Sequence, residues 1–228
     1  MTQQLEGPTE APSATPSTAE HPLRRALLLW FYVWVLTGVV ALAGAMIPLP
    51  FTSPAAQSMT WIVLYWVAHV ALVAAFVFPD AEARRVFGRA RPRAVEFCVL
   101  VGTVGGLVLW LIGALLPSYP WVSIEKQAGW PFAAALITGA VVPALFEEWM
   151  FRGLLQQRLS QVLSLRMAIC VQAMMFAVAH MDDLDLLSLF AFGLLTGVLR
   201  VAAGALWPCM ALHFIWNAAS YALDYQIL

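Results

Sequence analysis

The second half of the chain places ionisable residues directly beside strongly apolar runs. Glu147, Glu148 and Arg152 follow the apolar run 132–146. Successive helical residues point about 100° apart, so the two carboxylates cannot face the same site. Glu148 and Arg152 are at i, i+4 and can form an ion pair along one helix face, which leaves Glu147 free to face elsewhere. The alternative is a charged helix end with a local salt bridge.

Two histidines and one asparagine lie in similar surroundings nearer the C-terminus. His180 ends the apolar run 167–179, where a histidine is more often a helix-terminal or packed residue. His213 and Asn217 share one helix face, at i, i+4, within an otherwise uncharged run. Two hydrogen-bonding groups on one buried face indicate a shared role. His69 has no such neighbour in its own run, and we interpret it as structural.

A carboxylate, two imidazoles and an amide suit the hydrolysis of an amide bond. Glu147 would take a proton from water as a general base. His180 and His213 would orient that water, or would share a divalent metal such as zinc with Glu147. Asn217 would donate a hydrogen bond to the oxyanion of the tetrahedral intermediate. No Gly-x-Ser-x-Gly and no His-Glu-x-x-His motif occurs, so a serine nucleophile and a zincin site have no residues.

The composition places these residues in a membrane protein. Of the 228 residues, 62% are hydrophobic and 11% are Asp, Glu, Lys or Arg. An average soluble domain has about 45–50% and about 25%, so a soluble enzyme is excluded. The three cysteines are odd in number and all lie in apolar runs, which excludes a disulfide scaffold. The formal net charge of −1 gives no electrostatic footprint for nucleic acid.

The apolar runs predict an all-α, polytopic transmembrane helix bundle of about seven spans. The predicted spans are 26–47, 61–78, 97–116, 132–146, 167–179, 186–199 and 206–223. A span needs about 20 apolar residues, and the fourth, fifth and sixth runs are shorter. We expect these helices to extend through polar groups that face a polar intramembrane cavity among the four C-terminal helices.

The same patterns predict three regions and an orientation. Residues 1–22 are rich in proline and polar side chains, so we expect a disordered tail. Residues 23–130 would form N-terminal transmembrane helices, and residues 131–228 would form the catalytic core. With a cytoplasmic N-terminus, eleven of the twelve basic residues lie in cytoplasmic loops, as the positive-inside rule requires. We therefore expect a multi-pass protein of the cytoplasmic membrane if the source is bacterial.

Three motifs together resemble those of the CPBP family of intramembrane proteases. They are Glu-Glu-x-x-x-Arg at 147–152, Phe-x-x-x-His at 176–180 and His-x-x-x-Asn at 213–217, in this order and in apolar helices. The family comprises the CAAX prenyl endopeptidases and the bacteriocin-processing and self-immunity proteins. The resemblance covers roughly residues 132–223, about 40% of the chain. Each motif alone is weak, and the specificity lies in the ordered set.

The resemblance implies an intramembrane endopeptidase and gives roles to individual residues. Glu147 matches the catalytic glutamate, Glu148 its neighbour and Arg152 the supporting arginine. The remaining site positions match His180, His213 and Asn217. The family is described both as metalloproteases and as glutamate-dependent proteases that bind no metal. No cofactor is required by these residues; a metal, if present, would be held by Glu147, His180 and His213.

The substrate class stays open at this point. The resemblance implies a membrane-associated protein or peptide, cut near its C-terminus. It is either a lipidated tail, the C-terminal membrane anchor of a surface protein, or a secreted peptide. The excess of Arg over Lys, 11 to 1, hints at a GC-rich bacterial genome and favours an unprenylated substrate. The competing hypotheses are a non-enzymatic membrane scaffold or immunity protein and, less favoured because no internal repeat is visible, a transporter. The oligomeric state is open.

The predicted spans place two site residues at different depths. At about 1.5 Å per residue, Glu147 lies about 22 Å below the outer edge of its span. His180 lies about 20 Å above the inner edge of its own span, so in a hydrocarbon core about 30 Å thick the depths differ by roughly 10 Å. A kink at Pro143, a tilted helix or incorrect span limits would close this gap. The leaflet that the site faces is also open.

Overall fold

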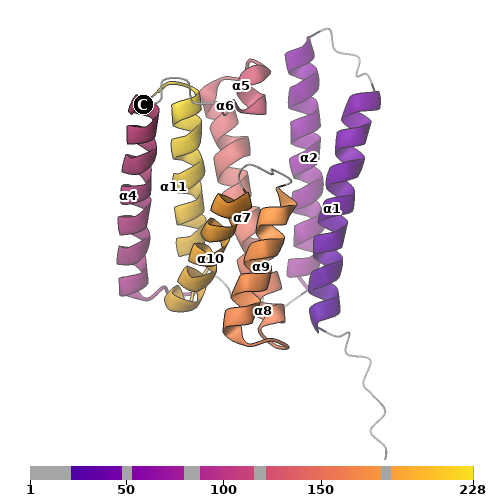
Figure 1. Ribbon diagram of the computed structural model, residues 1–228. Helices are drawn as coiled ribbons and strands as arrows, with labels where there is room; N and C mark the ends of the chain where they lie inside the picture. The colour runs from indigo at the N-terminus through magenta and orange to yellow at the C-terminus, as the bar shows by residue number, and fades with distance from the viewer. Residues whose placement is uncertain (1–21, 48–52, 80–87, 116–121, 181–185, 228) are drawn as a thin grey trace, which may run out of the picture.

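All regular elements of the described chain are helices (Figure 1). The computed structural model describes residues 22–47, 53–79, 88–115, 122–180 and 186–227. The predicted all-α class is confirmed within these ranges. The tail expected over residues 1–22 lies outside them, apart from Pro22, which begins the first helix.

Twelve helical segments make up the described part of the chain. The N-terminal part contains α1 (Pro22–Met46), α2 (Pro54–Val77) and α4 (Pro92–Leu115). A short helix, α5 (Ile124–Gln127), then precedes a long composite helix made of α6 (Phe132–Leu136), η1 (Ile137–Val141), α7 (Val142–Glu148), η2 (Trp149–Leu155) and α8 (Gln156–Leu159). The C-terminal part contains α9 (Leu165–Ala179), α10 (Leu186–Ala203) and α11 (Trp207–Asp224).

Several of these helices are suited to a lipid environment. Four described helices are long and apolar enough to cross a membrane, namely Leu23–Met46, Ala55–Val77, Phe132–Leu159 and Leu186–Ala203. Large apolar side chains lie exposed on the outside of the bundle; Leu42 is 61% exposed and Leu107 is 61% exposed. Such a surface is stable in lipid and not in water. The chain is thus an integral, multi-pass membrane protein, while the number of seven spans stays a prediction.

The two adjacent glutamates lie in the middle of a helix, which corrects the predicted end of the fourth span at residue 146. The composite helix continues to Leu159. It does so because Glu148 and Arg152 neutralise each other inside the bundle and do not have to reach solvent. The segments η1 and η2, on either side of α7, have the wider π-helical turn, a form that occurs mostly at functional sites.

This longer helix removes the difference in depth between the predicted site residues. The chain turns back between Leu159 and Leu165, where α9 begins. Glu147 lies 12 residues before Leu159, and His180 lies 15 residues after Leu165. At about 1.5 Å per residue these are about 18 Å and about 22 Å from the same turn. The span limits drawn from the sequence were therefore the source of the mismatch.

Close helix packing holds α9 and α10 around the site. A Cβ atom added at Gly193 would lie 2.9 Å from the Cα atom of Ala173, and one at Gly197 would lie 2.7 Å from Gln172 Nε2. The absence of side chains lets the backbones approach, as in other membrane helix pairs. Gln172 uses this proximity to donate a hydrogen bond to the carbonyl of Gly193 at 2.9 Å.

Candidate active site

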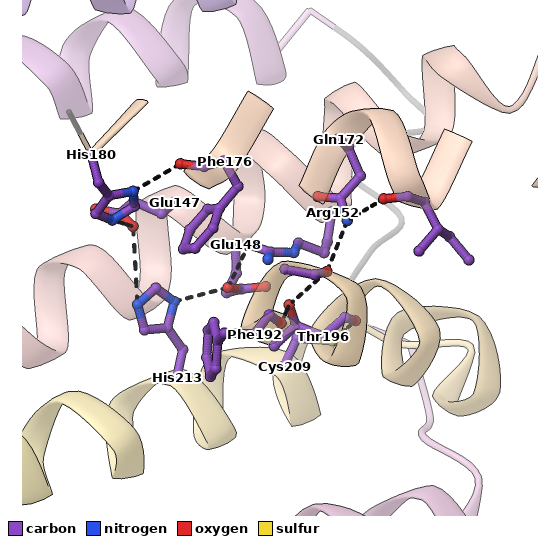
Figure 2. A network of polar contacts seen from close by, with 12 residues as sticks. Glu147, Glu148, Arg152, Gln172, Phe176, His180, Phe192, Thr196, Cys209 and His213 are labelled. Atoms are coloured by element: carbon purple, nitrogen blue, oxygen red, sulfur yellow. Dashed lines mark hydrogen bonds and ion pairs between the residues drawn. The ribbon is translucent and has the colours of Figure 1, made fainter. Parts of the chain in front are cut away.

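Two histidines from different helices converge on one oxygen of Glu147 (Figure 2). His180 Nε2 lies 3.6 Å from Glu147 Oε2, and His213 Nε2 lies 4.0 Å from the same atom. Glu147 is supplied by α7, His180 is the residue that ends α9, and His213 belongs to α11. Glu147 Oε2 is buried and accepts no hydrogen bond within the described part of the chain. Three residues separated in the sequence therefore meet at one carboxylate oxygen.

The partners of the opposite ring nitrogens define the tautomers of both histidines. His180 Nδ1 lies 2.8 Å from the backbone oxygen of Phe176. His213 Nδ1 lies 2.8 Å from Glu148 Oε1. Both partners are acceptors, so each Nδ1 carries the hydrogen and donates it. In a neutral imidazole, Nε2 then holds the lone pair, and both lone pairs face Glu147.

The predicted ion pair of Glu148 and Arg152 is confirmed and completely buried. Arg152 Nη1 lies 2.8 Å from Glu148 Oε1, and both side chains are 0% exposed. Glu148 Oε1 thus accepts hydrogen bonds from Arg152 and from His213. A carboxylate that holds Nδ1–H of a histidine fixes the orientation of the ring. The link to His213 was missed from the sequence, because the two residues are 65 positions apart.

Phe176 is the central apolar contact of this group. The Arg152 guanidinium lies 4.4 Å from the centroid of the Phe176 ring, a cation–π contact. The ring also contacts both imidazoles, at centroid distances of 4.6 Å to His180 and 6.1 Å to His213. The phenylalanine of the Phe-x-x-x-His motif therefore packs between the ion pair and the two histidines. Its position in the motif was the only signal of this in the sequence.

Asn217 contacts the backbone of the neighbouring π-helical segment. Pro143 has no N–H to offer to the carbonyl of Gly139, four residues earlier. Asn217 Nδ2 donates to that carbonyl at 3.0 Å. A Cβ atom at Gly139 would overlap the ring and hydroxyl of Tyr221, so this position accepts no side chain without rearrangement. One amide hydrogen of Asn217 is thus used by the backbone and the other is left for a ligand.

A pocket of about 360 Å³ brings these groups to one surface. Its polar lining includes Glu147, His180, His213 and Asn217, and also Glu125 of α5. Glu148 and Arg152 do not line it and lie behind His213. Glu125 was missed from the sequence, since it stands in a short polar segment between two apolar runs. The volume is in the range of small-ligand pockets, about 300–1,000 Å³.

His69 is hydrogen-bonded to a neighbouring helix. Thr37 Oγ1 of α1 lies 3.1 Å from His69 Nε2, and the Tyr65 carbonyl lies 2.7 Å from His69 Nδ1. These contacts agree with the structural interpretation of His69. The residue also borders a second pocket, of about 220 Å³, which shares Glu147 and His180 with the first.

The donors of a metal site are present here, but their spacing does not fit zinc. One carboxylate and two imidazoles are ordinary zinc ligands. Tetrahedral zinc would hold the ligand atoms about 3.3 Å apart, given bonds of about 2.0–2.1 Å. The observed separations from Glu147 Oε2 are 3.6 and 4.0 Å. Within the described residues, no group of three or more His, Cys, Asp or Glu side chains is arranged to hold a metal ion.

Comparison with known proteins identifies the part of the chain that builds this site. The model of the Rce1-like family, type II CAAX prenyl endopeptidases, matches residues 129–219. No curated protein and no solved structure gives a significant match. The matched residues extend from the end of α5 through most of α11 and contain all three motifs. Through residues 129–219 the chain therefore belongs to the Rce1-like CAAX protease family, and that family implies an intramembrane hydrolase.

Proposed function

We propose that the protein hydrolyses a peptide bond of a membrane-associated protein or peptide, near the C-terminus of that substrate. The convergence of His180 Nε2 and His213 Nε2 on Glu147 Oε2 is the observation that carries this proposal. The family match over residues 129–219 supports the reaction class. The bond to be cut would lie in the pocket that Glu147, His180 and His213 line, inside the membrane-spanning bundle.

The nucleophile in this proposal is a water molecule held by Glu147 and the two histidines. Three acceptors face one another, namely the Glu147 carboxylate and two Nε2 lone pairs. Acceptors repel unless a donor lies among them, and water supplies two hydrogens. Glu147 removes one of these hydrogens as the water oxygen attacks the carbonyl carbon. The same carboxyl group then gives the proton to the departing amine nitrogen, which leaves Glu147 ionised for the next cycle.

The negative charge that develops on the substrate carbonyl oxygen needs hydrogen-bond donors. The second amide hydrogen of Asn217 is one donor at the pocket surface. The hydrogen bond from Asn217 to Gly139 fixes the direction of this amide. Glu148 and Arg152 are positioning residues in this scheme, because they act on His213 and do not line the pocket.

The topology belongs to the same proposal. Seven spans with a cytoplasmic N-terminus would put α5 at the outer end of the bundle and α8 at the inner end. Figure 1 places these two short helices at opposite ends of the bundle. The substrate class that best suits a polar pocket between transmembrane helices is the membrane-anchoring C-terminus of another protein.

The decisive experiment compares strains that express the wild-type protein or Glu147→Gln. Mass spectrometry of membrane-protein C-termini is the readout, and Glu96→Gln, at an exposed position of α4, is the matched control. We expect one group of proteins to keep an uncut C-terminal segment only in the Glu147→Gln strain. Identical sets of termini in all three strains, together with a partner that co-purifies with each variant, would replace proteolysis by a binding-only role.

A further inference from the structure

The pocket contains a second carboxylate that the proposed reaction does not use. Glu125 lines the same pocket as Glu147, and it is only 4% exposed. Tyr221 donates a hydrogen bond to Glu125 Oε2 at 3.0 Å. Thr138 Oγ1 lies 3.3 Å from Glu125 Oε1. These two contacts hold the carboxylate toward the end of the pocket formed by α5, η1 and α11.

No cation of the described chain compensates the charge of Glu125. None of the described Lys, Arg and His side chains lies within ion-pair distance of it. Its neighbour Lys126 is paired with Asp224 instead, at 3.4 Å from Asp224 Oδ1. The described residues that line the pocket include two glutamates and no Lys or Arg. The pocket is therefore acidic, and a buried carboxylate without a cation is costly.

We propose that Glu125 is a specificity-determining residue that binds a Lys or Arg side chain of the polypeptide substrate. This inference rests on the proposed function and adds a substrate feature to it. A basic side chain would form a charge-assisted hydrogen bond with Glu125 and would offset the cost of burying its charge. Its aliphatic stem would lie along the apolar wall of the pocket, to which Trp216 and Leu189 contribute.

The fold gives an approximate distance between the basic side chain and the bond that is cut. Thr138, which contacts Glu125, precedes Glu147 by nine positions in the composite helix. At about 1.5 Å per residue this is about 13 Å along the axis. An extended peptide covers that distance in about four residues, at about 3.3 Å each. The basic residue is thus within about four positions of the scissile bond.

The test of this subsite measures binding, so that it does not depend on turnover. The full-length Glu147→Gln protein in detergent is exposed to apolar octapeptide amides that carry one photoreactive leucine. One Arg is moved along the peptide, and each peptide has a counterpart with citrulline, which has nearly the same shape and no charge. We expect at least one Arg position to label the protein about tenfold more than citrulline does. This preference is lost when Glu125→Gln is added.

A matched control and a fold check make the result decisive. Glu96→Gln removes an exposed carboxylate of α4 and leaves the preference for Arg in place. Glu125→Gln keeps an oxygen that can accept from Tyr221, so size-exclusion profiles of the two variants should coincide. Equal labelling by the Arg and citrulline peptides, or a preference that survives Glu125→Gln, would overturn the assignment.

The cleavage experiment separates failure of this subsite from failure of the proposed function. If Glu147-dependent C-termini exist but no Lys or Arg recurs within about four residues of the cut, the subsite is wrong and proteolysis stands. If no such termini exist while Arg peptides still depend on Glu125, the cation site stands and proteolysis is wrong. With a cleaved basic substrate, Glu125→Gln should raise KM about tenfold and change kcat little, because Glu125 is remote from the reacting atoms.

Discussion

Glu148 Oε1 accepts a hydrogen bond from His213 Nδ1 at 2.8 Å, across 65 positions of sequence. The same oxygen lies 2.8 Å from Arg152 Nη1. One buried carboxylate therefore neutralises an arginine and orients a histidine of the pocket. Stability and chemistry are coupled at this atom, and paired variants can separate them.

Removal of Arg152 should lower the amount of folded protein. Arg152→Ala leaves the Glu148 charge buried without its partner, and breaking such a pair costs about 3–5 kcal/mol. We expect a lower membrane abundance and a lower unfolding temperature. The double variant Glu148→Leu/Arg152→Met removes both charges and should recover abundance but not cleavage, because His213 loses its acceptor. Recovery of cleavage in this double variant would show that Glu148 does not position His213.

Glu147→Gln should abolish cleavage and leave the fold intact. Glu147 is 21% exposed and its Oε2 accepts no hydrogen bond in the described chain, so its loss should change stability by about 0.5 kcal/mol or less. Loss of a general base lowers the rate by about 100-fold or more. Cleavage of a defined substrate in liposomes and thermal unfolding of the same preparation give the two values. Wild-type turnover in this variant would exclude Glu147 as the base.

Two isosteres can separate the functions of the two nitrogens of His213. In His213→Asn, an amide nitrogen takes the place of Nδ1 and keeps the donor for Glu148, but nothing takes the place of Nε2. In His213→Gln, the amide takes the place of Nε2 and Glu148 loses its donor. We expect His213→Asn to be abundant and inactive, and His213→Gln to be less abundant as well. Immunoblots of membranes and cleavage assays measure the two effects; equal abundance would mean that the bond to Glu148 adds nothing to stability.

Asn217 should contribute to both stability and turnover, for different reasons. Asn217→Ala leaves the Gly139 carbonyl without the donor that lies 3.0 Å away, which costs about 1–3 kcal/mol. Pro143→Ala restores a backbone N–H four residues after Gly139. The double variant Asn217→Ala/Pro143→Ala should therefore recover unfolding temperature and stay slow in cleavage. If turnover returned together with stability, Asn217 would have no part in stabilising the oxyanion.

Chelation should leave cleavage unchanged. The separations of 3.6 and 4.0 Å from Glu147 Oε2 are wider than zinc ligands require. We expect protein dialysed against a strong chelator to keep its turnover, and added zinc to produce no increase. Elemental analysis of the purified protein is the accompanying measurement. Loss of activity on dialysis that zinc reverses would assign the metal to Glu147, His180 and His213.

Local spacing predicted the parts of this structure that local geometry determines. The i, i+4 pair of Glu148 and Arg152 follows from one helical turn, and apolar run lengths located α1, α2 and α10 closely. The end of the fourth span was wrong, because polar residues look like a helix end unless their buried partners are known. The contact between His213 and Glu148 depends on how α11 packs against α7, and no periodicity contains that information.

Glu125 shows the same limit for the pocket. It stands in a four-residue helix, and its neighbours Thr138 and Tyr221 come from two other elements. In the sequence it is one charged residue in a polar loop. Only the packing of α5 against η1 and α11 brings its carboxylate to the pocket.

The wide turns η1 and η2 make the site sensitive to chain length. Each residue added to or removed from a helix rotates the rest of that helix by about 100°. A deletion within Ile137–Val141 would turn Glu147 away from His180 and His213, while every side chain of the site stayed in the sequence. Insertions and deletions in this helix are therefore tolerated less than their apolar composition suggests. In an alignment of related chains, a constant number of residues between Glu125 and Glu147 would be the mark of this constraint.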